Sequence, residues 1–166
     1  MSTSPDAGDG IRDGVAVVTD STTYLPPDLI ERWGIEQVSL YVGWAGDHRP
    51  EREYDLDEFY ARLRESDDLP STSQPSVGDF LASYEPLAEA GRDVVSVHIA
   101  SGLSGTCESA REAARVIADK GLRGQVEVVD GQTGAGGLGC LVLAAAQAAA
   151  RGQSLAQVVE AVQQTR

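Results

Sequence analysis

The chain has 166 residues, of which 42% are hydrophobic and 23% charged, and its formal net charge is −13. This length and composition are typical of one globular domain. The negative charge, without a cluster of Lys or Arg, argues against binding to nucleic-acid phosphates or to anionic membrane surfaces. No apolar stretch approaches the roughly 20 residues of a membrane-spanning helix.

Residues 1–13 are polar and rich in Gly, Ser and Asp, which predicts a disordered N-terminal tail without the apolar segment of a signal peptide. Residues 14–166 are expected to form one α/β domain. Cys107 and Cys140 are too few and too isolated for a disulfide framework or a zinc site. We therefore expect a cytoplasmic protein with reduced thiols, without a metal or another cofactor.

Strands and helices are predicted to alternate along the chain. In order, the sequence predicts a strand at 14–19, a helix at 26–32, a strand at 35–42, a loop with at most an edge strand at 44–54, a helix at 55–65, a polar loop at 66–75, a helix at 77–89, a strand at 94–99, a helix at 107–120, a strand at 126–129, a glycine-rich loop at 131–139, a helix at 139–151 and a last helix from 154 to the C-terminus. The strands are continuous apolar runs, which is typical of strands buried on both faces. The predicted fold class is α/β, with a mostly parallel sheet and helices on both of its faces.

Three polar loops follow predicted strands, at residues 20–23, 101–106 and 130–139. In a right-handed α/β arrangement these loops meet at one edge of the sheet, where such folds bind ligands. The hydroxyl-rich segment at residues 72–76 precedes a helix and is a candidate to join them.

The segment Ser101-Gly102-Leu103-Ser104-Gly105-Thr106 is the strongest candidate site. Hydroxyl groups and backbone N–H groups at the start of a helix bind anions such as carboxylate or phosphate. Capping alone needs a single Ser or Thr, so this composition favours anion binding. The segment is neither a Walker A loop nor a Gly-x-Ser-x-Gly nucleophile elbow, and it therefore implies neither nucleotide binding nor a catalytic serine.

Other polar residues have two interpretations. Asp20, Ser21 and Thr22 either orient a ligand or form a local turn. We interpret Asp130 as a structural residue that holds the glycine-rich loop, and His98 as a hydrogen-bonded residue of the sheet rather than a catalytic base. No Ser/His/Asp or Cys/His set and no metal-ligand spacing is present in the sequence.

Several of these motifs, in this order, resemble the DegV family of bacterial fatty-acid-binding proteins. They are Val-Val-Thr-Asp-Ser-Thr at 17–22, Thr-Ser-Gln-Pro-Ser at 72–76, Tyr84-Glu85, Ser-Gly-Leu-Ser-Gly-Thr at 101–106 and Ser109-Ala110. The combination of Thr-Ser-Gln-Pro with Leu-Ser-Gly-Thr about 30 residues later is specific. The resemblance covers only the first lobe of a family that usually has two, so the second lobe is expected to be absent.

The resemblance implies a DegV-like N-terminal lobe, with an α/β fold shared with a dihydroxyacetone kinase domain. It implies that Thr72 and Ser104 bind the carboxylate of one long-chain fatty acid, with Ser73, Gly105 and Thr106 as supporting donors. It also implies a partner, a fatty acid kinase that converts the presented carboxylate to an acyl phosphate, so that the protein itself is a carrier and not an enzyme.

Two other classes of function remain open at this point. One is a small α/β enzyme that acts on a phosphorylated metabolite at the same loop. The other is an interaction module that pairs with a separate second lobe, or with itself through the face that the second lobe would cover.

Overall fold

The computed structural model describes residues 14–166. Its elements are β1 (Ala16–Asp20), the 3-10 helix η1 (Ser21–Thr23), α1 (Pro27–Trp33), β2 (Glu36–Val38), β3 (Tyr41–Trp44), β4 (Asp47–Pro50), the 3-10 helix η2 (Glu51–Glu53), α2 (Leu56–Glu65), β5 (Ser71–Ser73), α3 (Val77–Glu89), β6 (Val94–His98), α4 (Thr106–Asp119), β7 (Val126–Asp130), α5 (Ala135–Ala150) and α6 (Leu155–Thr165). The tail predicted at residues 1–13 lies outside the described residues.

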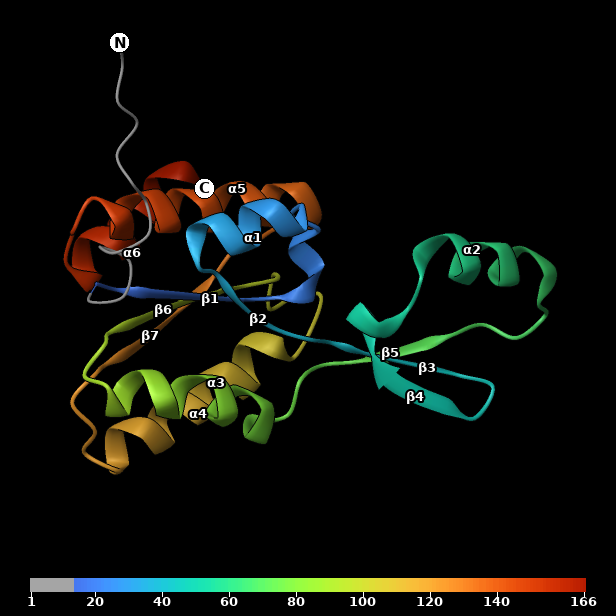
Figure 1. The fold of residues 1–166 in the computed structure, drawn as a ribbon. Coiled ribbons are helices and arrows are strands. Elements are labelled where there is room, and N and C mark those ends of the chain that lie inside the picture. Colours follow the sequence, from blue (N-terminus) through green and yellow to red (C-terminus); the bar gives the residue numbers. More distant parts are fainter. Residues whose placement is uncertain (1–13) are drawn as a thin grey trace, which may run out of the picture.

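A four-stranded parallel sheet with the order β2-β1-β6-β7 forms the centre of the main body. Helices α1, α5 and α6 cover one face of this sheet, and α3 and α4 cover the other (Figure 1). This arrangement confirms the predicted fold class.

The central strands are buried on both faces, which explains their continuous apolar sequence. In β1, Val17 packs into the cluster formed with α5 and α6, whereas the next residue, Val18, packs into the cluster formed with α3 and α4. Val97 and Val94 divide in the same way on β6. Each fully buried Val contributes about 1.5–3 kcal/mol to folding by leaving water, so the two layers hold the sheet from both sides.

A second, antiparallel sheet with the order β4-β3-β5 lies beside the main body (Figure 1). The prediction of one strand at residues 35–42 was wrong, because β2 pairs in the main sheet and β3 in the small one. Between them, the Leu40 N–H donates to Ser21 Oγ at 3.0 Å, and the Leu40 carbonyl accepts from the Glu51 N–H at 2.8 Å. Loop partners thus replace strand partners at Leu40, and the chain changes sheets there.

The small sheet joins the end of the strand predicted at 35–42 to two segments predicted as loops, the first of which was allowed an edge strand. Ala45 and Gly46 join β3 to β4 in a two-residue turn with φ values of 50° and 86°, as a type I′ hairpin requires. Thr72 and Ser73, expected in a loop, lie on β5. These strands are short and mostly polar, so they carry little hydrophobic periodicity.

Helix α5 begins at Ala135, four residues earlier than predicted, so the predicted glycine-rich loop is shorter than expected. Gly139 lies inside this helix, where an added Cβ would be 3.3 Å from the Thr23 carbonyl oxygen and 3.0 Å from Leu25 Cδ2. The glycine therefore allows the helix to approach the turn that follows β1.

Candidate functional site

A pocket of about 390 Å³ lies between the carboxyl edge of the main sheet and the small sheet. This volume is within the range of small-molecule sites. Its wall is formed by residues Thr22 and Tyr24, 40–42, Glu51, 72–74, Ile99 and 103–105. Four of the five site residues expected from the sequence are in this wall: Thr72, Ser73, Ser104 and Gly105.

The small sheet brings the Thr-Ser-Gln-Pro segment to the loop that follows β6. Thr72 pairs with Val42 of the central strand β3, and Gln74 follows directly after β5. A Cβ added to Gly105 would lie 2.9 Å from Gln74 Nε2. The two motifs therefore touch, and a side chain at position 105 would have to displace Gln74.

The side chain of Ser104 is hydrogen-bonded to Thr106. The two hydroxyl oxygens are 2.8 Å apart, and the Thr106 N–H donates to Ser104 Oγ at 3.3 Å. Thr106 is fully buried and does not line the pocket, unlike the other expected site residues. If the Thr106 hydroxyl also donates to Ser104 Oγ, the Ser104 hydrogen is left to donate to a ligand oxygen.

Ser101 does not line the pocket and is bonded to Asp130 instead. Its hydroxyl donates to Asp130 Oδ2 at 2.5 Å and its N–H to Asp130 Oδ1 at 3.2 Å. Asp130 also accepts the Gln132 N–H at 2.9 Å, which confirms its predicted role as the residue that holds the glycine-containing loop. Partial burial alone would raise the pKa of this carboxyl, but its bonds to Ser101 and Gln132 hold the pKa below the ordinary value.

Glu51 is the only charged residue in the described wall of the pocket, which contains no Lys, Arg or His. Ser21 Oγ donates to its carboxylate at 2.6 Å and the Tyr24 hydroxyl at 2.8 Å. Burial and the contact with Glu51 raise the pKa of Tyr24 to about 12, so that hydroxyl stays protonated as a donor. An anionic ligand would therefore depend on hydroxyl and N–H groups, not on a cation of the described wall.

A buried pair, Asp20 and His98, lies directly behind the pocket; both side chains are fully buried. His98 Nδ1 is 3.1 Å from Asp20 Oδ2, which also accepts the Ile99 N–H at 2.9 Å. Asp20 Oδ1 accepts the Thr22 N–H at 3.0 Å and the Thr22 hydroxyl at 2.5 Å. Burial would raise the pKa of Asp20, but the interactions with His98, Thr22 and Ile99 together lower it, so the group is a carboxylate.

The other ring nitrogen of His98 continues this chain of hydrogen bonds into the core. His98 Nε2 is 2.6 Å from Ser96 Oγ, which accepts the Tyr84 hydroxyl at 2.7 Å. A proton on Nδ1 and a lone pair on Nε2 satisfy every member. This confirms the interpretation of His98 as a hydrogen-bonded residue of the sheet. The statement that no Ser/His/Asp set is present was wrong, since Ser96, His98 and Asp20 form one, but all three side chains are fully buried.

Sequence reasoning did not connect Asp20 with His98, which is 78 residues away. A usable signal existed, since each is the polar last residue of an apolar strand, and β1 and β6 are neighbours in which Thr19 pairs with Val97. Sequence reasoning also missed two residues of the pocket wall, Tyr24 and Glu51. Tyr24 follows η1 and Glu51 begins η2, and the hydrogen bond between them joins residues 27 positions apart in the sequence.

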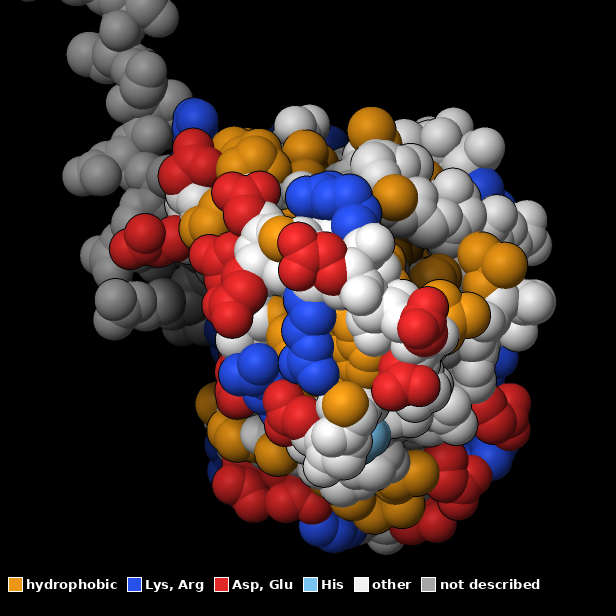
Figure 2. All heavy atoms as spheres, turned by 90° about the vertical axis from the view of Figure 1, so that its right-hand side faces the viewer, with side chains coloured by type: hydrophobic (Ala, Val, Ile, Leu, Met, Phe, Trp, Pro, Cys, Tyr) orange, Lys and Arg blue, Asp and Glu red, His pale blue; other side chains and the backbone are white. Residues whose placement is uncertain are grey.

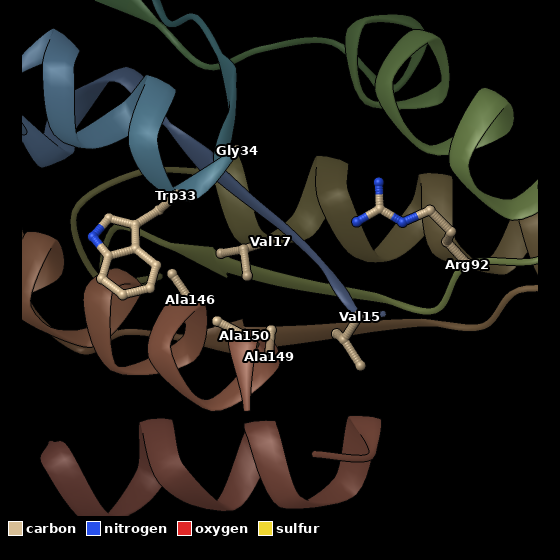
Figure 3. A pocket seen from close by; sticks show the side chains of 8 residues that line it. All are labelled: Val15, Val17, Trp33, Gly34, Arg92, Ala146, Ala149 and Ala150. Carbon is tan, nitrogen blue, oxygen red and sulfur yellow. The ribbon is translucent and has the colours of Figure 1, made fainter. Parts of the chain in front are cut away.

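A second pocket, between α1, β1 and α5, is a packing gap (Figure 3). Its volume is about 10 Å³, which is at the lower limit for a single water molecule. Trp33 and small alanine side chains of α5 surround it (Figure 3). It has no room for a ligand.

Within residues 14–166, no group of three or more His, Cys, Asp or Glu side chains is placed to bind a metal ion. None of the helices in that range has both the length and the hydrophobicity needed to cross a membrane.

Comparison with known proteins identifies the family. A family model described as an uncharacterised protein of the DegV family matches residues 14–166. The chain belongs to the DegV family. Among curated DegV proteins, a DegV domain-containing protein of Clostridium perfringens is 37% identical over 151 residues, which are 91% of this chain and 53% of that protein.

Solved DegV structures share the fold of this chain. A DegV family protein from Thermus thermophilus, described by its fatty acid binding, superposes with a TM-score of 0.82 at 37% identity, over 92% of this chain and 53% of that one. DegV of Bacillus subtilis, described as a fatty acid binding protein, gives 0.83 at 32% identity, again over 92% and 53%. The chain thus spans about half the length of these relatives, and the two solved structures are described by their fatty acid binding.

Proposed function

We propose that this DegV domain binds a long-chain fatty acid by its carboxylate and presents it to a fatty acid kinase, which forms the acyl phosphate. Thr72 and Ser104 bind the carboxylate, and Ser73 and Gly105 support them. Thr106 supports the site indirectly, through Ser104. The observation that carries the proposal is that the pocket wall contains both motifs, one on β5 of the small sheet and the other in the loop that follows β6 of the main sheet.

The chemistry of the wall suits an acid with an apolar tail. A carboxylate that leaves water needs strong donors, and hydroxyl and N–H groups form charge-assisted hydrogen bonds with it. Leu40, Val42 and Ile99 supply apolar contacts in the same wall. Each methylene group of a tail buried there would add about 0.8 kcal/mol.

The binding site is tested with Ser104→Ala and a titration with oleate. Loss of one hydrogen bond to a charged group should weaken binding by about 1.5–3 kcal/mol. Ser83→Ala is the matched control, since Ser83, on α3, donates to Glu36 of β2 and does not line the pocket. Equal affinity of Ser104→Ala and the control would contradict the assignment.

Presentation to a kinase is tested separately. A purified fatty acid kinase, with ATP and oleate, should form acyl phosphate faster when this domain is added, and the domain alone should form none. The kinase partner, the non-catalytic role and the cytoplasmic location are supported by the family resemblance. Turnover of phosphate esters by the isolated domain would instead favour a small enzyme.

Self-association through the face that a second lobe would cover is also proposed. Tyr24 and Leu103, both in the pocket wall, are 57% and 73% exposed, so apolar surface is available at the mouth of the pocket. Native mass spectrometry would reveal dimers together with any bound lipid. A monomer at all concentrations would contradict this part.

A further inference from the structure

The buried carboxylate of Asp20 connects two walls of the pocket without lining it. Asp20 is the last residue of β1, and it accepts hydrogen bonds from Thr22, which follows on the same chain segment, and from Ile99, which follows the neighbouring strand β6. Thr22 and Ile99 both line the pocket, whereas Asp20 is fully buried.

We infer that Asp20 is a positioning residue of the binding site, whose carboxylate fixes Thr22 and Ile99 in the arrangement that receives the ligand. The inference rests on the proposed function. It assigns Asp20 no contact with the ligand, because the wall residues lie between them.

Only a carboxylate fits the four donors around Asp20. Its two oxygens accept the N–H and hydroxyl of Thr22, the N–H of Ile99 and the ring N–H of His98, so both oxygens act only as acceptors. An asparagine has one acceptor oxygen and one NH₂ donor. If the oxygen faces Thr22, His98 adapts by moving its proton to Nε2, but the NH₂ group then meets the Ile99 N–H, and that donor loses its partner.

The same bonds determine what Thr22 offers to a ligand. Its hydroxyl hydrogen is used in the bond to Asp20, so Thr22 Oγ1 presents only lone pairs toward the pocket. Without an acceptor oxygen at this place, the hydroxyl is free to rotate, and the wall loses its fixed pattern of donors and acceptors.

The test compares the dissociation constant for oleate in the wild type and in Asp20→Asn, Thr22→Val and the double variant. We expect Asp20→Asn to weaken binding at least tenfold. The loss in the double variant should be smaller than the sum of the two single losses, because Asp20 acts partly through Thr22.

Asp93→Asn is the matched control. Asp93 precedes the same strand, β6, and its carboxylate also accepts a backbone N–H, that of Gln125, but it lies at the opposite end of the sheet from the pocket. Asparagine can still accept this single bond, so the affinity should stay at the wild-type value.

Hydrogen exchange provides a readout without ligand. In Asp20→Asn, the Ile99 amide should exchange faster, while the amide of Val95 in the middle of β6 stays protected. Unchanged affinity, strictly additive losses in the double variant or unchanged exchange at Ile99 would each overturn the inference. Failure of the wild type to bind oleate would overturn the proposed function, and with it the role of Asp20 in binding.

Discussion

At the scale of single residues, the three hydroxyl groups of the segment 101–106 have different partners. Ser101 is bonded to Asp130, Thr106 is buried beneath Ser104, and Ser104 is the one in the pocket wall. The composition that pointed to anion binding therefore also serves to shape the loop. As Asp130 accepts hydrogen bonds from its own loop and from Ser101, Asp20 accepts them from Thr22 and from Ile99.

The ionisation of Asp20 should be visible in protein stability. Asp20→Asn leaves a buried donor unpaired, so at neutral pH the free energy of unfolding should fall by roughly 1–3 kcal/mol. The native pKa of Asp20 is below its ordinary value, and the stabilisation by the carboxylate is thus fully present above the unfolded pKa of about 3.9. It is lost as the pH falls through the native pKa.

Urea unfolding over a series of acidic pH values checks this prediction. The difference in unfolding free energy between the wild type and Asp20→Asn should narrow once the pH drops below about 4. A difference that stays constant into strongly acidic solution would show that the carboxylate charge is not responsible.

At the scale of elements, close backbone approaches decide where glycine is needed. A Cβ added to Gly124, between α4 and β7, would lie 1.9 Å from the Arg92 carbonyl oxygen and 3.0 Å from Ala88 Cα. Both neighbours are backbone atoms, Ala88 in the last turn of α3 and Arg92 in the connection from α3 to β6, so they cannot move away as a flexible side chain would.

Gly124→Ala should therefore destabilise the protein by about 1–3 kcal/mol or more. Gly136→Ala is the control, because an added Cβ in this first turn of α5 meets no atom within 4 Å. That variant should be neutral or more stable by up to about 1 kcal/mol. Thermal unfolding measures the stability of both variants. If Gly124→Ala were as stable as the wild type, the backbone between α3 and β6 would have to shift to make room for the added methyl group.

The sequence predicted those elements whose signals are local. Apolar strands and capped helices were found because burial on two faces and caps such as the Ser76–Asp79 capping box leave direct patterns. The small sheet was not found, since Thr72 and its neighbours form polar strands whose pairing with Val42 spans distant residues. Composition alone pointed to the segment that contains Ser104, and the resemblance predicted Thr72 and Ser104 as the carboxylate ligands. The Asp20–His98 pair and Glu51 needed the three-dimensional arrangement.

At the scale of the whole molecule, the two sheets differ in how firmly they are held. Helix α2, which accompanies the small sheet, buries none of its residues, whereas α5 buries several against the main sheet. Figure 2, which faces the side of the small sheet, shows acidic and basic side chains mixed over this surface. Sparse burial lowers the free energy of local opening.

Amide hydrogen exchange should accordingly be faster in α2 than in α5. A ligand in the pocket would contact β3, β5 and the loops that follow β1 and β6, so oleate should slow exchange in β3 and β5 and leave the protected centre of α5 unchanged. Hydrogen–deuterium exchange with mass spectrometry measures both effects. Equal protection of α2 and α5 in the free protein would contradict this view of the fold.

Glu51 also has a consequence for the speed of capture. A fatty acid anion must approach this like charge on a chain whose net charge is −13. Dissolved salt limits such repulsion to about 8 Å at physiological ionic strength. Stopped-flow mixing should therefore show faster association of oleate as salt is added, and no such gain for the uncharged methyl ester. The acidity of this chain would then govern how quickly a ligand arrives, more than how long it stays.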